Sequence, residues 1–243
     1  MMNGENMSDF FKFENEKIDF PFYKDNPFLS TKEWLVLLAG ALTFIGILAV
    51  PIKIDPNLTP FLLCLSVLLP SLYVCKGKFK LLFRKVERKD LKLIIICLIA
   101  YYIYAIAMGF VLDYLNMAPG TNVVFNEKMD IVFWIGAFIQ LLGEELYKVS
   151  SFLIILHVIF KITHKRKLSA ICGVIITLLS FGLLHYNAYE GAVVHIILTI
   201  GLGGIFYFYA YLKTKNVMVG YIVHLLIDGI PFLFATLVQI FGL

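Results

Sequence analysis

The chain has 243 residues, of which 60% are hydrophobic and only 16% are charged, and its mean hydropathy is +0.85. A soluble domain is typically about 45–50% apolar and about 25% charged. The composition therefore excludes an ordinary soluble enzyme or binding domain and indicates a polytopic membrane protein, while the net charge of +4 identifies no partner. The length fits one compact helix bundle.

The N-terminal segment, residues 1–33, is predicted to be cytoplasmic or interfacial and to precede an all-α transmembrane bundle over residues 34–243. The first 30 residues are acidic and aromatic and lack an apolar core, so a cleaved signal peptide is not expected. The stretch from Asp9 to Tyr23 mixes aromatic and charged residues and is predicted to lie along the lipid headgroups as an anchor. The four cysteines lie in apolar segments without CxxC spacing, which predicts packing roles.

Seven segments are apolar over about the 20 residues that a membrane-spanning helix needs. Gly229-Ile-Pro231 interrupts the last of them and is expected to kink it or to split it into two short helices, which would make eight spans. The segments are Trp34–Ile52, Leu58–Cys75, Leu93–Leu115, Ile131–Phe160, Leu168–His185, Gly191–Leu212 and Val217–Leu243.

The basic residues alternate between the loops that join these segments. Two thirds of the 21 Lys and Arg fall in residues 76–92, 161–167 and 213–215, whereas the opposite loops hold only Lys53 and Lys128. The positive-inside rule then predicts a multi-pass protein of the cell membrane with the basic loops and the N-terminus in the cytoplasm. Contact with anionic lipid explains such loops better than nucleic acid, which is not expected as a partner.

Ionisable side chains interrupt otherwise apolar runs at three places. A charge near the middle of a bilayer costs about 2.5–3.5 kcal/mol on insertion scales. We therefore expect these groups to share one water-accessible polar site. They are Glu144 and Glu145 in the fourth segment, His185 at the end of the fifth, and His224 with Asp228 in the seventh.

Glu144 and Glu145 lie in mid-segment, about 22–24 Å from the cytoplasmic end of their helix. Neighbouring side chains on a helix point about 100° apart, so one carboxylate is expected to face substrate or water while the other pairs elsewhere. A carboxylate held away from bulk water is a stronger base, which suits the activation of a water molecule. The alternative is a structural ion pair, for which Lys148, one turn away, is the candidate partner.

His185 closes its segment about 26 Å from the cytoplasmic end, with Phe181 one turn earlier on the same face. His224 and Asp228 are four residues apart and share a helix face, so the carboxylate can orient the imidazole. By the same count His224 lies only about 12 Å from the cytoplasmic end. Either its helix begins deeper than predicted, or the site is stretched along the membrane normal.

Other polar residues are weaker candidates. His157 and His164 lie at the cytoplasmic end of the fourth segment, where histidines are ordinarily interfacial. His195 lies one turn into the sixth segment and is a supporting candidate for the site. The glycines of Gly201-Leu-Gly-Gly204 are expected to allow close helix packing rather than to contact substrate.

The order Glu-Glu, Phe-x-x-x-His and His-x-x-x-Asp on three separate spans resembles the CPBP family, also called Abi. This family comprises CAAX prenyl endopeptidases and bacteriocin-processing or self-immunity proteins. The resemblance covers residues 131–231 and includes Gly-Glu-Glu-Leu, Ser-Phe-Gly-Leu-Leu-His and Val-Gly-Tyr-Ile-Val-His-Leu-Leu-Ile-Asp. The first motif of the family is Glu-Glu-x-x-x-Arg, but Val149 stands here at the arginine position. Lys148 precedes it, about 100° around the helix.

What the resemblance implies is an intramembrane glutamate-dependent endopeptidase that needs no cofactor. Glu144 and His185 would activate a water for attack on the scissile amide. His224, oriented by Asp228, would stabilise the oxyanion, and Glu145 would orient the site. The implied partners are lipid and a membrane-associated or secreted peptide or protein precursor. The supporting residues would be Phe181, Lys148 and His195.

Three alternatives stand beside this hypothesis. A zinc hydrolase would use His185, His224 and Glu144 around an open water position, although the His-Glu-x-x-His arrangement is lacking. A non-catalytic self-immunity or scaffold protein of the same fold would fit the replacement of the motif arginine by Val149. An ion-coupled transporter also carries carboxylates and histidines in its spans, but the sequence has no detectable inverted repeat. The oligomeric state does not follow from the sequence.

Overall fold

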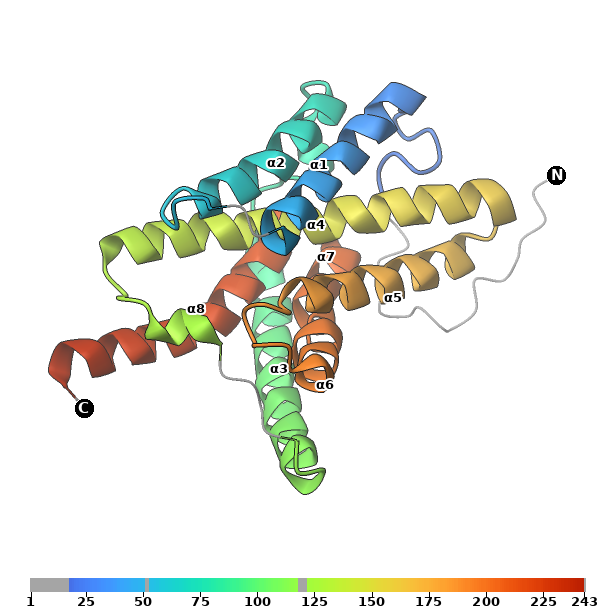
Figure 1. Cartoon of the computed structure of the whole chain (residues 1–243). Coiled ribbons are helices and arrows are strands. Elements are labelled where there is room, and N and C mark those ends of the chain that lie inside the picture. The colour runs from blue at the N-terminus through green and yellow to red at the C-terminus, as the bar shows by residue number, and fades with distance from the viewer. Residues whose placement is uncertain (1–17, 51–52, 118–121, 243) are drawn as a thin grey trace.

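The computed structural model describes residues 18–50, 53–117 and 122–242. Within these ranges every regular element is a helix (Figure 1), which confirms the predicted all-α class. The helices are α1 (Thr31–Ala49), α2 (Thr59–Cys75), η1 (Phe79–Leu81), α3 (Arg88–Tyr114), η2 (Val123–Asn126), α4 (Ile131–Thr163), α5 (Arg166–Leu184), α6 (Val193–His195), η3 (Ile196–Leu202), α7 (Ile205–Thr214) and α8 (Val217–Phe241).

Six helical stretches of the described chain are long and apolar enough to cross a membrane, fewer than the seven or eight predicted. They are α1, α3, α4, α5, α8 and the stretch from α6 through η3, a turn of π-helix, to α7. The shorter helix is α2, with 17 residues. It ends where Lys76 takes a left-handed conformation with φ 49°. A helix of that length spans about 25 Å, less than the hydrocarbon thickness of about 30 Å.

The expected split of the last segment at Pro231 is wrong, because α8 continues through it. A proline inside a helix removes the hydrogen bond to the carbonyl four residues earlier, here that of Ile227. The Tyr102 hydroxyl of α3 donates to this carbonyl at 2.9 Å. A neighbouring helix therefore satisfies the group that the proline leaves free, as is common inside membranes.

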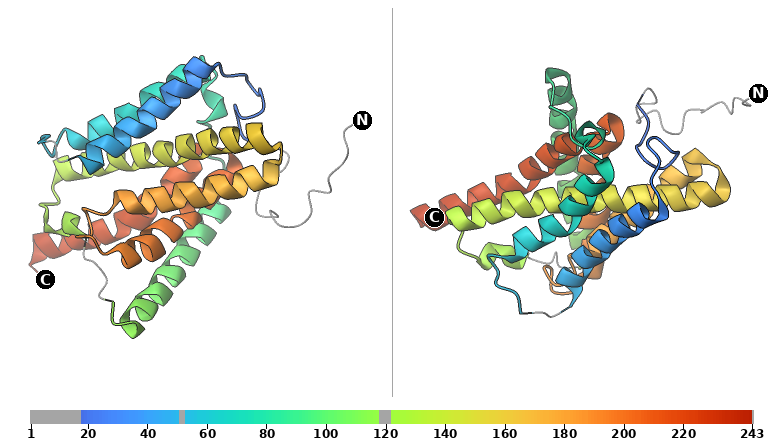
Figure 2. Two further views of the ribbon diagram at one scale, coloured as in Figure 1. Left: turned by 45° about the vertical axis from the view of Figure 1, so that its right-hand side comes forward. Right: turned by 90° about the horizontal axis from the view of Figure 1, so that it is seen from above.

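Helix α4 is the central element of the bundle and packs against α1, α2, α5 and α8 (Figures 1 and 2). It starts at Asp130, whose carboxylate accepts hydrogen bonds from the backbone N–H groups of Val132 and Phe133. Its approach to α2 depends on Gly143, since a methyl group there would lie 2.8 Å from Cys64 Cα. Helix α3 packs instead against α7 and α8.

Glycines also bring α5 and the π-helical stretch together. A methyl group on Gly182 would lie 2.8 Å from Gly201 Cα, so the two backbones are in direct contact. This is the packing role expected for the glycines of residues 201–204. The contact fixes the end of α5, where His185 stands.

Residues 18–29 fold into the end of the bundle rather than along its surface. Phe20, Phe22 and Tyr23 are buried, at 1–3% exposure, and the Phe20 ring meets that of Phe152 with 4.8 Å between centroids. The predicted headgroup anchor is therefore wrong for its described part, because these rings pack into a protein core. The remainder of that anchor, before residue 18, lies outside the described residues.

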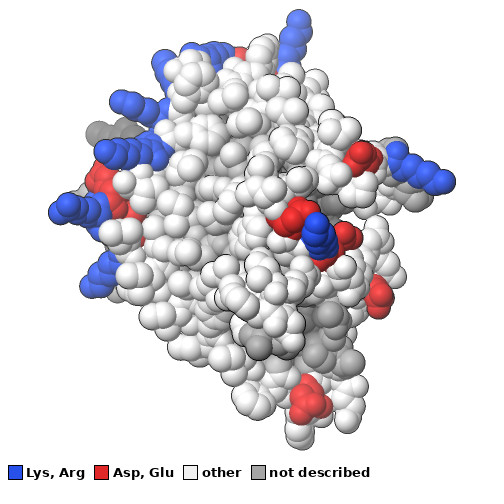
Figure 3. Space-filling model, turned by 90° about the vertical axis from the view of Figure 1, so that its left-hand side faces the viewer, with Lys and Arg blue, Asp and Glu red and all other residues white. Residues whose placement is uncertain are grey.

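The three basic loops meet at this same end. Arg166, the first residue of α5, pairs with Asp19, with 2.7 Å between Nη2 and Oδ1. In the α2–α3 loop the Arg84 backbone N–H donates to the side chain of Asn216, in the α7–α8 turn, at 3.0 Å. Figure 3 shows the Lys and Arg side chains gathered mainly along one side of a largely uncharged surface. These contacts join the basic segments to one another, and their predicted cytoplasmic location stays a prediction.

The α7–α8 turn lies inside the protein. Lys215, Asn216 and Val217 are at most 2% exposed, and Lys215 Nζ lies 3.9 Å from the centroid of the Phe20 ring. Helix α8 thus begins well short of the end of α4, which projects beyond it in Figures 1 and 2. This sunken start brings His224 level with the middle of α4 and removes the depth mismatch counted from the sequence.

Gly143→Ala is expected to destabilise the bundle by about 1–3 kcal/mol, the usual cost of overpacking. The added carbon would meet the Cα and N atoms of Cys64, which belong to a helix backbone and cannot rotate away. The matched control is Gly109→Ala in α3, where nothing lies within 4 Å of the added carbon. Thermal unfolding in detergent, followed by circular dichroism, should lower the midpoint of the first variant only. Equal midpoints would contradict the close contact between α2 and α4.

Candidate functional site

Four helices supply the polar and aromatic side chains that meet inside the bundle. Three of these residues lie within two turns of α4, and two lie four residues apart on α8. Residues at such spacings project from the same side of a helix. The residues are Glu144, Glu145 and Lys148 of α4, Phe181 of α5, Tyr207 of α7, and His224 and Asp228 of α8.

Glu145, Lys148 and His224 form a buried cluster of three ionisable groups. Glu145 Oε1 lies 2.5 Å from Lys148 Nζ and 3.0 Å from His224 Nδ1, and Nζ lies 3.4 Å from the same ring nitrogen. The side chains of Glu145 and Lys148 are fully buried. The other carboxylate oxygen, Oε2, faces Gly220, where an added methyl group would lie only 2.8 Å away. The glycine therefore makes room for this carboxylate.

Two aromatic rings cover the ammonium group of Lys148. Its Nζ lies 3.7 Å from the centroid of the Tyr207 ring and 4.3 Å from that of Phe181. A desolvated cation over an aromatic face gains about 2 kcal/mol or more. Tyr207 also stacks on the His224 imidazole, with 4.2 Å between centroids and 15° between planes. The rings thus hold both the cation and the imidazole in place.

Glu144 occupies a different position beside the same imidazole. Its Oε2 lies 3.8 Å from His224 Nε2, while its Oε1 accepts a hydrogen bond of 2.9 Å from Gln140 Nε2. The two adjacent carboxylates therefore reach opposite nitrogens of one ring. Glu145 has a cation as its closest partner, whereas within the described part of the chain Glu144 contacts a neutral amide and a more distant imidazole.

Asp228 also faces His224 Nε2, at 3.5 Å from its Oδ2. Its side chain is 34% exposed, compared with 3% for His224, so this carboxylate marks the accessible edge of the cluster. If the imidazole donates its Nδ1–H to Glu145, Nε2 faces Glu144 and Asp228. Protonation of Nε2 would then make it a donor towards this edge.

His185 stands next to the cluster but makes no ion pair with its carboxylates within the described chain. Its Nδ1 lies 3.0 Å from the Phe181 carbonyl oxygen, and its ring packs on the Phe181 ring at 4.8 Å. The Phe181 ring lies 6.1 Å from that of His224. An Nδ1–H bound to this carbonyl leaves Nε2 of His185 as an acceptor.

Within the described residues, His195 and His157 form no ion pair or hydrogen bond with the side chains of the cluster. His195 packs against Tyr189 at 5.0 Å, and its buried Nδ1 has no hydrogen-bond partner among the described residues. Burial raises the pKa of Tyr189 to about 12, so this phenol stays neutral at physiological pH. His157 stacks on Trp34 at 4.1 Å and has a structural role.

Sequence reasoning missed two residues of the site, Gln140 and Tyr207. Gln140 precedes Glu144 by four residues, and this spacing alone could have identified it as a partner on the same face. Tyr207 carries no comparable signal, because it stands among several aromatic residues of α7. Its position becomes apparent only when α7 packs against α8.

A metal site does not emerge from the described residues. No group of three or more His, Cys, Asp and Glu side chains there has an arrangement that could hold a metal ion. The closest cation to the carboxylates is Lys148 Nζ, which occupies the space beside Glu145. Whether the protein uses a metal ion stays a question for the experiment described below.

Residues 128–230 match the family model described as type II CAAX prenyl endopeptidase, Rce1-like. The chain carries an Rce1-like segment. It extends from just before α4 into α8 and contains every residue of the polar cluster, and it confirms the predicted resemblance to the CPBP family. No curated protein and no solved structure matches the chain.

The Rce1-like segment places its cation at Lys148 rather than at the arginine position of the motif. Val149 is 1% exposed and belongs to the hydrophobic core. Lys148 reaches Glu145 across three residues of the same helix. Glu145, the second glutamate of the pair, therefore has a cationic partner. This cation projects from α4 about 100° away from the position at which the motif has its arginine.

Lys148→Met is expected to destabilise the Rce1-like segment by about 3–5 kcal/mol, because it leaves the Glu145 carboxylate buried without its cation. The double variant Lys148→Met with Glu145→Gln removes both charges and should recover most of the loss. Thermal midpoints in detergent measure the effect, with Lys24→Met as an exposed control. A double variant as unstable as the single one would contradict this charge pairing.

Proposed function

We propose that the protein is an intramembrane glutamate-dependent endopeptidase. The observation that carries the proposal is the Glu144 carboxylate beside the His224 imidazole within an Rce1-like segment. The family description names an endopeptidase, and the cluster supplies a base and hydrogen-bond donors of the kinds that amide hydrolysis requires.

Glu144 is the proposed general base. It takes a proton from a water molecule as the water oxygen attacks the scissile carbonyl carbon, and it later gives a proton to the departing amide nitrogen. His185 assists through Nε2, which accepts a hydrogen bond from the same water. Glu145 pairs with Lys148 and contacts Nδ1 of His224. We therefore assign both residues the role of positioning the His224 ring.

His224 is the proposed oxyanion donor. Its Nε2–H would stabilise the negative charge that forms on the carbonyl oxygen during attack. Asp228, at 3.5 Å, orients this nitrogen towards the accessible edge of the cluster. Tyr207 fixes the plane of the ring by stacking on it.

The proposed substrate is a membrane-associated or secreted peptide or protein precursor. The family description names a CAAX prenyl endopeptidase, so a lipidated peptide is one proposed form of this class. The proposed orientation has the basic loops in the cytoplasm, since most Lys and Arg lie at that end of the bundle.

Glu144→Gln is expected to abolish processing while preserving the fold, because the amide keeps the shape and the Gln140 contact but cannot accept a proton. General-base catalysis contributes about 10²–10⁴-fold, so turnover should fall at least about hundredfold. Mass spectrometry of secreted and membrane peptides from cells with wild-type, Glu144→Gln or Glu190→Gln protein would show the result. Glu190 is exposed and serves as the control.

The same comparison separates the non-catalytic alternative, which the valine at position 149 favours. If Glu144→Gln leaves all peptides unchanged but partner binding or immunity persists, the protein is a binding or self-immunity protein of the same fold. A transporter would instead move solute in proteoliposomes without generating any new peptide.

Metal removal provides a separate test of the proposed mechanism. Cleavage is expected to continue after treatment with EDTA and 1,10-phenanthroline, because the proposed base and donor are side chains. Metal content of the purified protein should be far below one ion per chain. Loss of cleavage that added zinc restores would instead favour the zinc alternative with His185, His224 and Glu144.

A further inference from the structure

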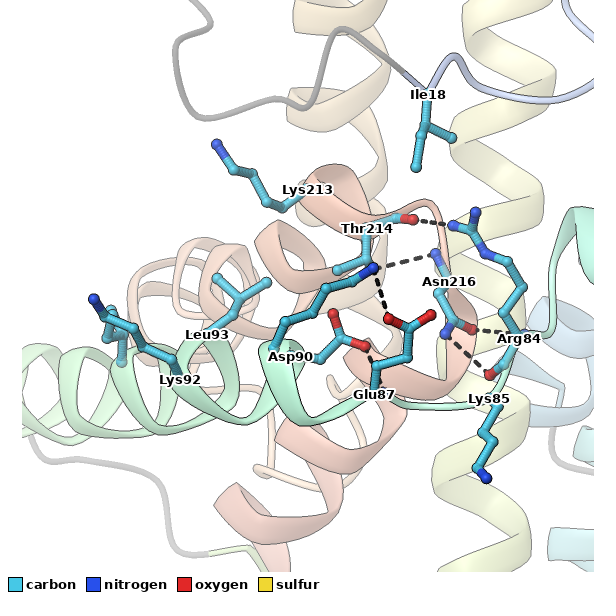
Figure 4. Close-up of a pocket in the computed structure, with 12 residues that line it drawn as sticks. Ile18, Arg84, Lys85, Glu87, Asp90, Lys92, Leu93, Lys213, Thr214 and Asn216 are labelled. Atoms are coloured by element: carbon cyan, nitrogen blue, oxygen red, sulfur yellow. Dashed lines mark hydrogen bonds and ion pairs between the residues drawn. The ribbon is translucent and has the colours of Figure 1, made fainter.

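A cavity of about 420 Å³ opens at the basic end of the molecule and shares no lining residue with the polar cluster (Figure 4). It lies between the start of α3, the loop that precedes α3, and the end of α7. Small-molecule sites in proteins typically measure about 300–1,000 Å³. The cavity is therefore large enough for a small polar ligand or a headgroup.

The cavity walls carry a positive excess. Its two acidic side chains are engaged: Glu87 pairs with Lys89 at 2.7 Å, and Asp90 accepts the Glu87 backbone N–H at 2.9 Å. Lys85 and Lys92 are exposed and form no ion pair with any described residue. Figure 4 shows these two lysines on different sides of the cavity.

Arg84 and Lys213 add two further cations to the lining. The Arg84 guanidinium donates to the Thr214 backbone carbonyl, which is neutral, so its charge is not cancelled by this contact. Guanidinium groups also bind phosphate oxygens in a planar, two-point geometry. The cavity thus offers charge complementarity to an anion with several oxygens.

Apolar side chains form the side of the cavity that faces along α3. Leu93 and Ile96 line it. Beyond them the outward face of α3 continues with Ile95, Ile99 and Ile103, which are 54–64% exposed. An anion bound in the cavity would lie at the N-terminal end of α3, next to the exposed apolar face of this helix, which is the face available to lipid chains. This continuity favours a ligand with a charged head and hydrocarbon tails.

We propose that this cavity binds the headgroup of an anionic phospholipid, which would lie across the cavity between Lys85 and Lys92 with its acyl chains along α3. Basic pockets between transmembrane helices on the cytoplasmic side commonly bind acidic lipid headgroups. The bound lipid would connect α3 with the α7–α8 turn, because Arg84 contacts both Thr214 and Asn216. The inference does not depend on endopeptidase activity.

Native mass spectrometry of the full-length protein in detergent tests the proposal. The probes are phosphatidylglycerol, phosphatidylcholine with the same acyl chains, glycerophosphoglycerol and inorganic phosphate. The wild type should retain phosphatidylglycerol in preference to phosphatidylcholine. Lys85→Gln with Lys92→Gln should weaken phosphatidylglycerol binding by roughly 25-fold, since each lysine near an acidic lipid is worth about fivefold.

The matched control is Lys78→Gln with Lys80→Gln. These exposed lysines belong to the same basic loop but do not line the cavity. This control should bind phosphatidylglycerol as the wild type does. An equal loss in both double variants would overturn the proposal in favour of diffuse surface attraction. Displacement of the lipid by inorganic phosphate or glycerophosphoglycerol at equal concentration would assign the site to a soluble phosphate and also overturn it.

Discussion

The contact between Lys148 Nζ and the Glu145 carboxylate is the interaction on which the rest of the site depends. An unpaired ammonium or carboxylate at this depth would cost several kcal/mol even after relaxation. Side chains from four helices stabilise the two charges. Helix α4 supplies the ion pair, α8 supplies the imidazole of His224, and α5 and α7 supply the rings that cover the ammonium. Their positions therefore constrain one another.

This constraint explains why α8 begins inside the protein. His224 stands only seven residues after the start of α8, whereas Glu145 is far from the basic end of α4. The two meet because the α7–α8 turn is sunk into the bundle and Phe20 covers Lys215 within it. The buried aromatic residues of the N-terminal segment thus support the depth of the site, although they lie outside the Rce1-like segment.

Much of the fold follows from hydropathy, and the rest depends on long-range contacts. The predicted segment Ile131–Phe160 corresponds to α4, Ile131–Thr163, because a long apolar run flanked by a cap and a basic loop leaves few alternatives. The continuity of α8 through Pro231 could not be predicted, since it depends on the Tyr102 hydroxyl, 129 positions earlier in the chain. Tyr207 was missed for the same reason. Glu144, Glu145, His224 and Asp228 were identified because charged residues stand out in apolar runs. Spacing along one helix also predicted the pairs Lys148–Glu145 and His224–Asp228. The contact between Glu145 and His224 joins two helices and could not be predicted from spacing.

The division of labour between the two glutamates follows from their surroundings. Adjacent positions point about 100° apart on a helix, and the Glu145 carboxylate is the one that contacts the ammonium of Lys148 at 2.5 Å. A carboxylate fixed by a cation at 2.5 Å is a poor base, because proton uptake would break that pairing. Among the described residues no Lys or Arg pairs with Glu144, and its Oε2 lies 3.8 Å from His224 Nε2. The lysine at position 148 therefore neutralises one carboxylate and leaves the other, Glu144, as the proposed base.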